Sequence, residues 1–193
     1  NGRIWMAFNN KILYYQNHLV DFSDYLDGYK VPYVVAGMPS GDIFIADSYG
    51  LYIYDSKTMS RKQELKFSNK IYNLKSAFAA SSGDVFLLTG SEGIVYRIPG
   101  GCQQPQPIAN EYTSLVSQLV EFGGSIVGGN NTGLVKFNGT TFEEMCPTSA
   151  SVLGLRSIDG RLWIGMENGL GIFGSDGNIQ KLNIPTMANM PIN

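Results

Sequence analysis

The chain repeats one short pattern five times, and this internal repeat limits the available folds more than any other feature. Each copy begins with a glycine, continues with an apolar run, passes through a few polar residues and ends in a second apolar run. The copies are GRIWMAFNNKILYY from residue 2, GDIFIADSYGLYIY from 41, GDVFLLTGSEGIVYRI from 83, GSIVGGNNTGLVKF from 124 and GRLWIGMENGLGIF from 160. The leading glycines are 39, 42, 41 and 36 residues apart. A period near 40 residues indicates an array of equivalent structural units.

Each unit is expected to contain four short β-strands. Two alternating apolar runs joined by a short polar turn predict a hairpin. A third strand follows in HLVDF, QELKF, TFEEM and IQKLNI, and a fourth, more apolar run leads to the next glycine in VPYVVAGM, IYNLKSAFAA, SLVSQLVEF and SVLGLRSI. Four strands in about 40 to 45 residues are typical of a propeller blade. The sequence therefore predicts an all-β protein, a β-propeller of about five four-stranded antiparallel blades.

The whole chain is expected to form a single propeller region, residues 1–193. The repeats run approximately over residues 2–40, 41–82, 83–123, 124–159 and 160–193. No apolar run of the fourth type precedes Gly2, so about 19 strands are expected and the region resembles a fragment of a larger, seven-bladed ring. An unclosed ring leaves sheet edges and blade faces uncovered, which predicts self-association.

One position in the repeat is aromatic in four of the five units. It is occupied by Trp5, Phe44, Phe86, Val127 and Trp163. Equivalent positions imply equivalent packing, so this side chain is expected to fill the wedge between neighbouring sheets. Trp163 is accordingly predicted to be buried, and its replacement by alanine to cost about 3 to 5 kcal/mol.

Composition excludes several classes of function. The formal net charge is -2 and charged residues make up only 16% of the chain, so there is no basic surface for nucleic acid or for an anionic membrane. No apolar run approaches the ~20 residues of a membrane-spanning helix. The two cysteines, Cys102 and Cys146, are too few for a cysteine-only zinc site and leave open one disulfide or two free thiols. No metal and no cofactor are expected.

Residues 159–173 resemble the two-component-regulator propeller repeat. The resemblance rests on the motif DGRLWIGMENGL followed by IF. Residues 2–15 match this motif except that Lys11 replaces the turn glycine. Units two and three match more loosely, and unit four lacks the tryptophan. The resemblance implies the sensor region of a hybrid two-component signalling protein of Bacteroides-type bacteria, periplasmic or extracellular, with carbohydrate breakdown products as ligands. It also implies that membrane span and histidine kinase lie in other parts of the parent protein.

A ligand site is expected where turns and blade connections meet. In an up-and-down blade, the turn between the second and third strands emerges at the same end as the connection to the next blade. Tyrosine rings beside carboxylates and amides suit an oligosaccharide, because the ring faces stack and the polar groups bind hydroxyls. The candidate ligand-binding residues are Asp24, Tyr25, Tyr29, Tyr33, Tyr49, Glu92, Tyr112, Asn131 and Glu167.

Other functions remain open from the sequence. Asp21, Asp24 and Asp27 could hold calcium but lack the glycine and distal acid of a dedicated loop. No motif in the sequence supplies the single histidine, His18, with partners for hydrolytic or metal chemistry. No catalytic residues are therefore assigned, and the chain is not expected to be an enzyme. A carboxylate pair for a glycosidase or lyase could still be assembled from acids in different blades. A protein–protein interaction platform is the remaining alternative.

Overall fold

The computed structural model describes residues 3–8, 11–23, 34–90, 92–174 and 176–182. Within this part of the chain there are 19 strands and one three-residue 3-10 turn, Pro99–Gly101. All sheets are antiparallel, which confirms the predicted all-β propeller.

Five sheets follow one another along the chain, and we call them blades 1 to 5. Blade 1 contains β1 (Ile4–Phe8), β2 (Lys11–Gln16) and β3 (His18–Asp21). Blade 2 contains β4 (Val34–Gly37), β5 (Ile43–Ala46), β6 (Gly50–Tyr54) and β7 (Arg61–Lys66). Blade 3 contains β8 (Leu74–Ala79), β9 (Val85–Thr89), β10 (Val95–Ile98) and β11 (Gln106–Ile108). Blade 4 contains β12 (Gln118–Phe122), β13 (Ser125–Gly129), β14 (Gly133–Phe137) and β15 (Phe142–Pro147). Blade 5 contains β16 (Val152–Ile158), β17 (Arg161–Met166), β18 (Gly169–Phe173) and β19 (Ile179–Lys181).

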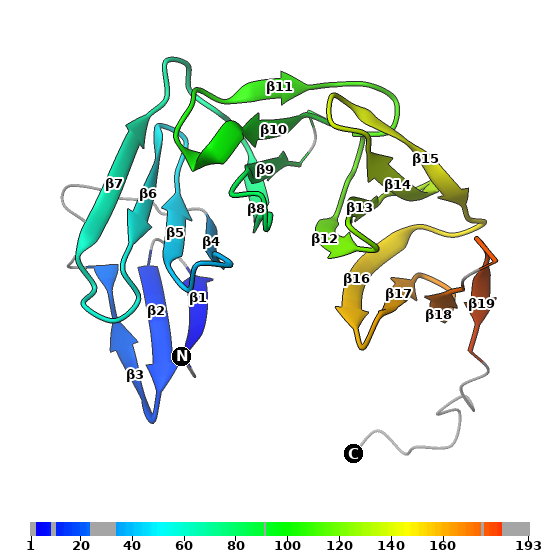
Figure 1. Ribbon diagram of the computed structural model, residues 1–193, viewed down its shortest axis with the longest axis horizontal. Helices are drawn as coiled ribbons and strands as arrows, with labels where there is room; N and C mark the ends of the chain where they lie inside the picture. Colours follow the sequence, from blue (N-terminus) through cyan, green and yellow to red (C-terminus); the bar gives the residue numbers. More distant parts are fainter. Residues whose placement is uncertain (1–2, 9–10, 24–33, 91, 175, 183–193) are drawn as a thin grey trace.

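The blades stand side by side along an open arc (Figure 1). The first strands of neighbouring four-stranded blades, β4, β8, β12 and β16, contact one another and line the inside of the arc. In blade 1 the strand equivalent to β5 is β1, and the described residues supply no strand inside it. Each repeat therefore gives three strands to one blade and the innermost strand to the next.

Tight turns join the first two strands of each four-stranded blade, and they all lie on the same rim of the propeller. The leading glycine of the repeat has a positive φ there, +89° at Gly83 and +71° at Gly160. Residues with a side chain rarely adopt this conformation, which explains why the repeat begins with glycine.

The hydrophobic core consists of four clusters, one for each contact between successive blades. Phe44 of blade 2 is packed against blade 3, Phe86 of blade 3 against blade 4, and Val127 of blade 4 against blade 5, and all three are fully buried. Trp5 and Tyr14 pack more loosely between blades 1 and 2. Burying one such side chain stabilises the fold by about 1.5 to 3 kcal/mol, so the blade interfaces hold the arc together.

Trp163 corrects the prediction made for this position, because it is only half-buried. In β17, Leu162, Ile164 and Met166 point toward blade 4 and are buried. Trp163 points to the other face, which no other sheet of the described residues covers. The side chain has the expected orientation but lacks the neighbour that would bury it.

The exposed large apolar side chains fall into two groups. One group lies on the outward faces of the end blades and comprises Ile4, Tyr15 and Leu19 of blade 1 and Ile158 and Leu170 of blade 5. Leu153, also in blade 5, is the unpaired residue of the irregularity in β16. The other group comprises Tyr49, Tyr72 and Leu115, which lie in turns and blade connections.

Candidate functional site

The turns between second and third strands meet the blade connections on one rim of the propeller, along all of its blades. We call this rim the connection end. The backbone N–H of Ile71, in the β7–β8 connection, donates to the carbonyl of Ser48 in the β5–β6 turn at 2.9 Å. Val152, at the start of blade 5, donates likewise to Asn130 in the β13–β14 turn at 2.8 Å. The turns and the blade connections therefore lie next to each other, as expected from the repeat.

The predicted site residues are dispersed around this end. Asp24, Tyr25, Tyr29 and Tyr33 lie outside the described residues. Tyr49, Glu92, Asn131 and Glu167 are exposed in the second-to-third-strand turns of blades 2, 3, 4 and 5, and Tyr112 is half-buried in the connection to blade 4. No hydrogen bond in the described part of the chain joins two of these five side chains.

Tyr49 instead belongs to a cluster with Lys70 and Tyr72, two residues outside the predicted site. The Lys70 ammonium lies 5.0 Å from the centre of the Tyr49 ring and 4.7 Å from that of Tyr72. Tyr49 is 57% exposed and Tyr72 54% exposed. The apolar run IYNLKSAFAA predicts an inner strand that includes Tyr72, but β8 begins only at Leu74, so Tyr72 is part of the connection. The polar run SNK before it was the available signal.

A pocket of about 230 Å³ adjoins this cluster and shares Lys70 with it. It lies where the β7–β8 connection passes β10 and the segment before β11. Its lining comprises Ser68, Asn69, Lys70, Ile71, Tyr96, Gln104, Pro105 and Pro107. Lysine is the only charged residue type in that lining, and it is accompanied by hydroxyl, amide and aromatic groups.

Two hydrogen bonds fix the wall of this pocket. Gln104 accepts a bond from the backbone N–H of Ser68 at 2.8 Å and donates one to the carbonyl of Lys66 at 2.9 Å. The amide thereby ties blade 3 to blade 2. Burial raises the pKa of Tyr96, and the negative charge of Glu92 adds to the effect, so this hydroxyl is a neutral group in the pocket at physiological pH.

Glu92 stands next to the same connection. Its carboxylate accepts a hydrogen bond from the Asn73 side chain at 3.3 Å. Of the five described candidate residues, the structure thus brings Tyr49 and Glu92 to the β7–β8 connection, whereas Tyr112, Asn131 and Glu167 are placed elsewhere around the connection end.

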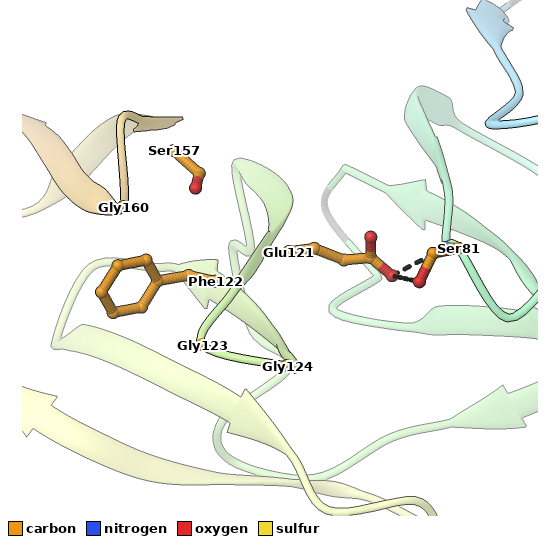
Figure 2. Close-up of a pocket in the computed structure, with 7 residues that line it drawn as sticks. All are labelled: Ser81, Glu121, Phe122, Gly123, Gly124, Ser157 and Gly160. Carbon is orange, nitrogen blue, oxygen red and sulfur yellow. Dashed lines mark hydrogen bonds between the residues drawn. The ribbon is translucent and has the colours of Figure 1, made fainter.

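A second pocket, of about 340 Å³, lies opposite the connection end, at the turns that join the first and second strands of blades 3, 4 and 5. Figure 2 shows the residues that line it. Glu121 accepts hydrogen bonds from both the backbone N–H and the hydroxyl of Ser81 at 2.7 Å, which joins blades 3 and 4. Phe122 points the other way, toward Ser157 and Gly160. In the sequence, the sign of this pocket is a lone glutamate, Glu121, shortly before the Gly123–Gly124 turn.

Chemical groups for catalysis or metal binding are sparse in the part of the chain that is described. It contains no group of three or more His, Cys, Asp or Glu residues placed to hold a metal ion. His18 is exposed at the beginning of β3. Cys102 is exposed, Cys146 is buried, and both thiols are free. Across the described ranges, no helix is long and apolar enough to cross a membrane.

Solved structures with the same fold include a lyase, extracellular domains of two-component systems and a protein bound to a peptide. The chain aligns over 95% of its length with 67% of virginiamycin B lyase from Staphylococcus aureus, at a TM-score of 0.73 and 15% identity. It aligns over 94% of its length with 28% of the extracellular domain of the hybrid two-component system BT4673 from B. thetaiotaomicron, at a TM-score of 0.66 and 13% identity. YCF48 bound to D1 peptide aligns with 92% of the chain, over 63% of its own length, at a TM-score of 0.63 and 16% identity.

These likenesses establish the propeller fold and do not by themselves assign a function. No protein-family model and no curated protein sequence matches the chain. The chain spans about two thirds of the lyase and about a quarter of the signalling domain.

Proposed function

We propose that this chain is a non-catalytic, ligand-binding propeller segment from the sensor region of a hybrid two-component protein, exposed to the periplasm or the cell exterior, with oligosaccharides as ligands. The likeness to extracellular domains of such systems supports the proposal, as does the repeat resemblance in residues 2–15 and 159–173. The membrane and kinase parts would belong to other regions of the parent protein.

The observation that carries the proposal is the exposed pair Tyr49 and Tyr72 beside Lys70. Large aromatic rings are usually withdrawn from water, so two of them held in the open on adjoining backbone segments favour a ligand that stacks on them. Sugars offer apolar ring faces for stacking and hydroxyls for the neighbouring amides and hydroxyls. The adjoining pocket provides such groups in Ser68, Asn69 and Gln104.

The two alternatives differ from this function in measurable ways. A protein-interaction platform would present a larger, more apolar surface at the connection end. A glycan-cleaving enzyme would turn its ligand over. A lyase is among the proteins with a similar fold, so cleavage of the ligand must also be measured. The substrate in the name of that lyase is said of that protein only.

Titration calorimetry with a panel of oligosaccharides tests the proposal on the chain itself. The tyrosine cluster and its pocket come entirely from blades 2 and 3, so the site does not depend on further blades. We expect binding that weakens about tenfold or more in Tyr49→Ala and in Tyr72→Ala, the scale of one lost stacking contact. Tyr15→Ala is the matched control, because Tyr15 is 46% exposed but lies on blade 1 away from the site.

Three results would overturn the proposal. They are the absence of binding to every saccharide, equal losses in the control and the two site variants, and release of cleaved product from any glycan.

A further inference from the structure

We propose that Asn168 is a site of spontaneous covalent modification, at which the side-chain amide is converted to aspartate and isoaspartate through a succinimide. The inference is independent of the proposed function, although Asn168 lies in the turn that carries the candidate residue Glu167. Asparagine followed by glycine is the pair most prone to this reaction, because glycine has no side chain to shield its backbone nitrogen.

The sequence contains this pair at residues 1–2, 138–139 and 168–169. The first pair lies outside the described residues. Asn138 and Asn168 are both exposed, in the β14–β15 turn and the β17–β18 turn. A Cβ placed on either of the glycines that follow them would have no atom within 4 Å. Both pairs therefore have room for the succinimide ring, and any difference in reactivity depends on how their groups are held.

Hydrogen bonds hold the Asn138 amide at both of its polar atoms. Its oxygen accepts from the backbone N–H groups of Thr140 at 3.1 Å and Thr141 at 3.0 Å. Its nitrogen donates to the Glu143 carboxylate at 3.1 Å. The amide carbon must turn toward the nitrogen of the following glycine in order to react, so these bonds must break first.

The Asn168 amide has no hydrogen-bond partner among the residues that the structure describes. Its side chain is exposed, in a turn of two residues between Met166 and Gly169. The amide carbon can thus approach the Gly169 nitrogen without the loss of a bond.

The attacking nitrogen, that of Gly169, also lacks a restraint that other blades have. In blade 2 the equivalent N–H, of Gly50, donates to the Asp47 side chain at 2.8 Å, and blade 4 has the same arrangement. Met166 stands three residues before Gly169, as Asp47 does before Gly50, but its side chain carries no oxygen. Gly169 is paired with Met166 at the last position of the ladder, where opening costs little free energy.

The reaction needs only water as a second reactant. The Gly169 nitrogen loses its proton to solvent and attacks Cγ of Asn168, so that an N–Cγ bond forms. The Cγ–Nδ2 bond then breaks, and Nδ2 takes up a proton and leaves as ammonia. Water opens the succinimide at one of its two carbonyls, which yields aspartate or isoaspartate.

Either product changes the charge of the connection end in blade 5. A carboxylate replaces a neutral amide directly beside Glu167, so two like charges share one turn. Isoaspartate also routes the main chain through the former side chain and lengthens the turn.

Timed incubation of the full chain at mildly alkaline pH, followed by peptide mapping by mass spectrometry, tests the inference. Water enriched in heavy oxygen marks the residues that convert during the incubation. We expect Asn168 to convert at least about tenfold faster than Asn138, the scale of the one or two hydrogen bonds that Asn138 must break. The chain unfolded in denaturant is the control, because the two pairs should then react at similar rates.

Two variants separate the sites. Glu143→Ala removes the acceptor of the Asn138 amide nitrogen, so it should speed conversion of Asn138 and leave Asn168 unchanged. Asn168→Gln should abolish conversion at this position, because its longer side chain closes a less favourable ring. Equal rates at the two sites in the folded chain, faster conversion of Asn138, or conversion of Asn168 only after unfolding would overturn the inference.

Discussion

Blades 1 and 2 carry the same residues at equivalent positions and yet expose them very differently. Ile4 and Ile43 each stand two residues after the leading glycine of their repeat, and Tyr15 and Tyr54 are their cross-strand partners. Ile4 and Tyr15 are 62% and 46% exposed, whereas Ile43 and Tyr54 are each 3% exposed. The difference arises because blade 2 has blade 1 against this face and blade 1 has no described sheet there.

Blade 5, the last blade of the arc, shows the same contrast. Phe86 in blade 3 and Trp163 in blade 5 occupy one repeat position, but only Phe86 has the next blade against it. The repeat pattern thus determines which way a side chain faces, while the neighbouring sheet determines whether it is buried. The outward face of blade 1 corresponds to the face by which blades 2 to 5 pack on the blade before them. The outward face of blade 5 corresponds to the face by which blades 1 to 4 pack on the blade after them.

The largest effect that would test this contrast is expected at Phe86. Phe86→Ala leaves a cavity between blades 3 and 4 and should lower the free energy of unfolding by about 3 to 5 kcal/mol. Trp163→Ala removes a larger but half-exposed ring and should cost only about 1 kcal/mol. Chemical denaturation of both variants measures the two values. Equal costs would show that the outward face of blade 5 is packed as tightly as an internal interface.

A second prediction concerns the outward faces themselves. We expect the chain to self-associate through them, because each exposes large apolar side chains, Ile4, Tyr15 and Leu19 on blade 1 and Ile158 and Leu170 on blade 5. Leu19→Ser on blade 1 or Leu170→Ser on blade 5 should weaken association about tenfold, the effect of losing one buried leucine contact. Sedimentation over a range of concentrations measures this. Leu115→Ser, at an exposed leucine outside both faces, is the control.

That prediction would fail if the unmodified chain sedimented as a single monomeric species at every concentration. It would also fail if the control variant weakened association as much as the two face variants do.

A smaller effect is expected from two equivalent buried turn residues, Asp47 and Asn130. Each accepts hydrogen bonds from the backbone N–H groups two and three residues later, and Asn130 also donates to the carbonyl of Tyr112 at 3.0 Å. Burial raises the pKa of Asp47 above its usual value, so its charged form destabilises the fold. This cost is absent below the ordinary aspartate pKa near 4 and develops as pH rises through the folded value.

Reciprocal substitutions test this sign. Asp47→Asn should keep or raise stability at pH 7, within about 1 kcal/mol, and should match the unmodified chain at pH 3. Asn130→Asp should be less stable at pH 7, because it loses the donor to Tyr112, and should recover part of that loss on acidification. Thermal melts at the two pH values measure both. The raised pKa of Asp47 would be contradicted if Asp47→Asn were less stable than the unmodified chain and its relative stability did not rise between pH 3 and pH 7.

Much of the architecture followed from the sequence because the repeat acts locally. A glycine period near 40 residues and alternating apolar runs specify hairpins and blades without knowledge of distant contacts, and all four predicted inner runs contain the observed strands β4, β8, β12 and β16. The exposure of Trp163 was not predictable in this way, because it depends on a neighbouring sheet.

The candidate site could be assembled from the sequence less completely, for the same kind of reason. Tyr49 was identified from its turn, but its partners Lys70 and Tyr72 come from a later connection and meet it only after blade 2 has folded. Glu121 was missed because its bond to Ser81 spans two blades. Pairings between separate repeats leave no periodic signal in a single sequence.

Hydrogen exchange of the chain with and without a bound oligosaccharide tests the account most directly, because it locates the ligand on the arc. We expect slower exchange in residues 47–50, 67–73 and 104–107, the segments that hold the tyrosine cluster and its pocket. Segments at the opposite end, residues 121–124 and 157–160, should remain unchanged. Protection confined to that opposite end, or to the outward faces of blades 1 and 5, would contradict the assignment of the ligand site to blades 2 and 3.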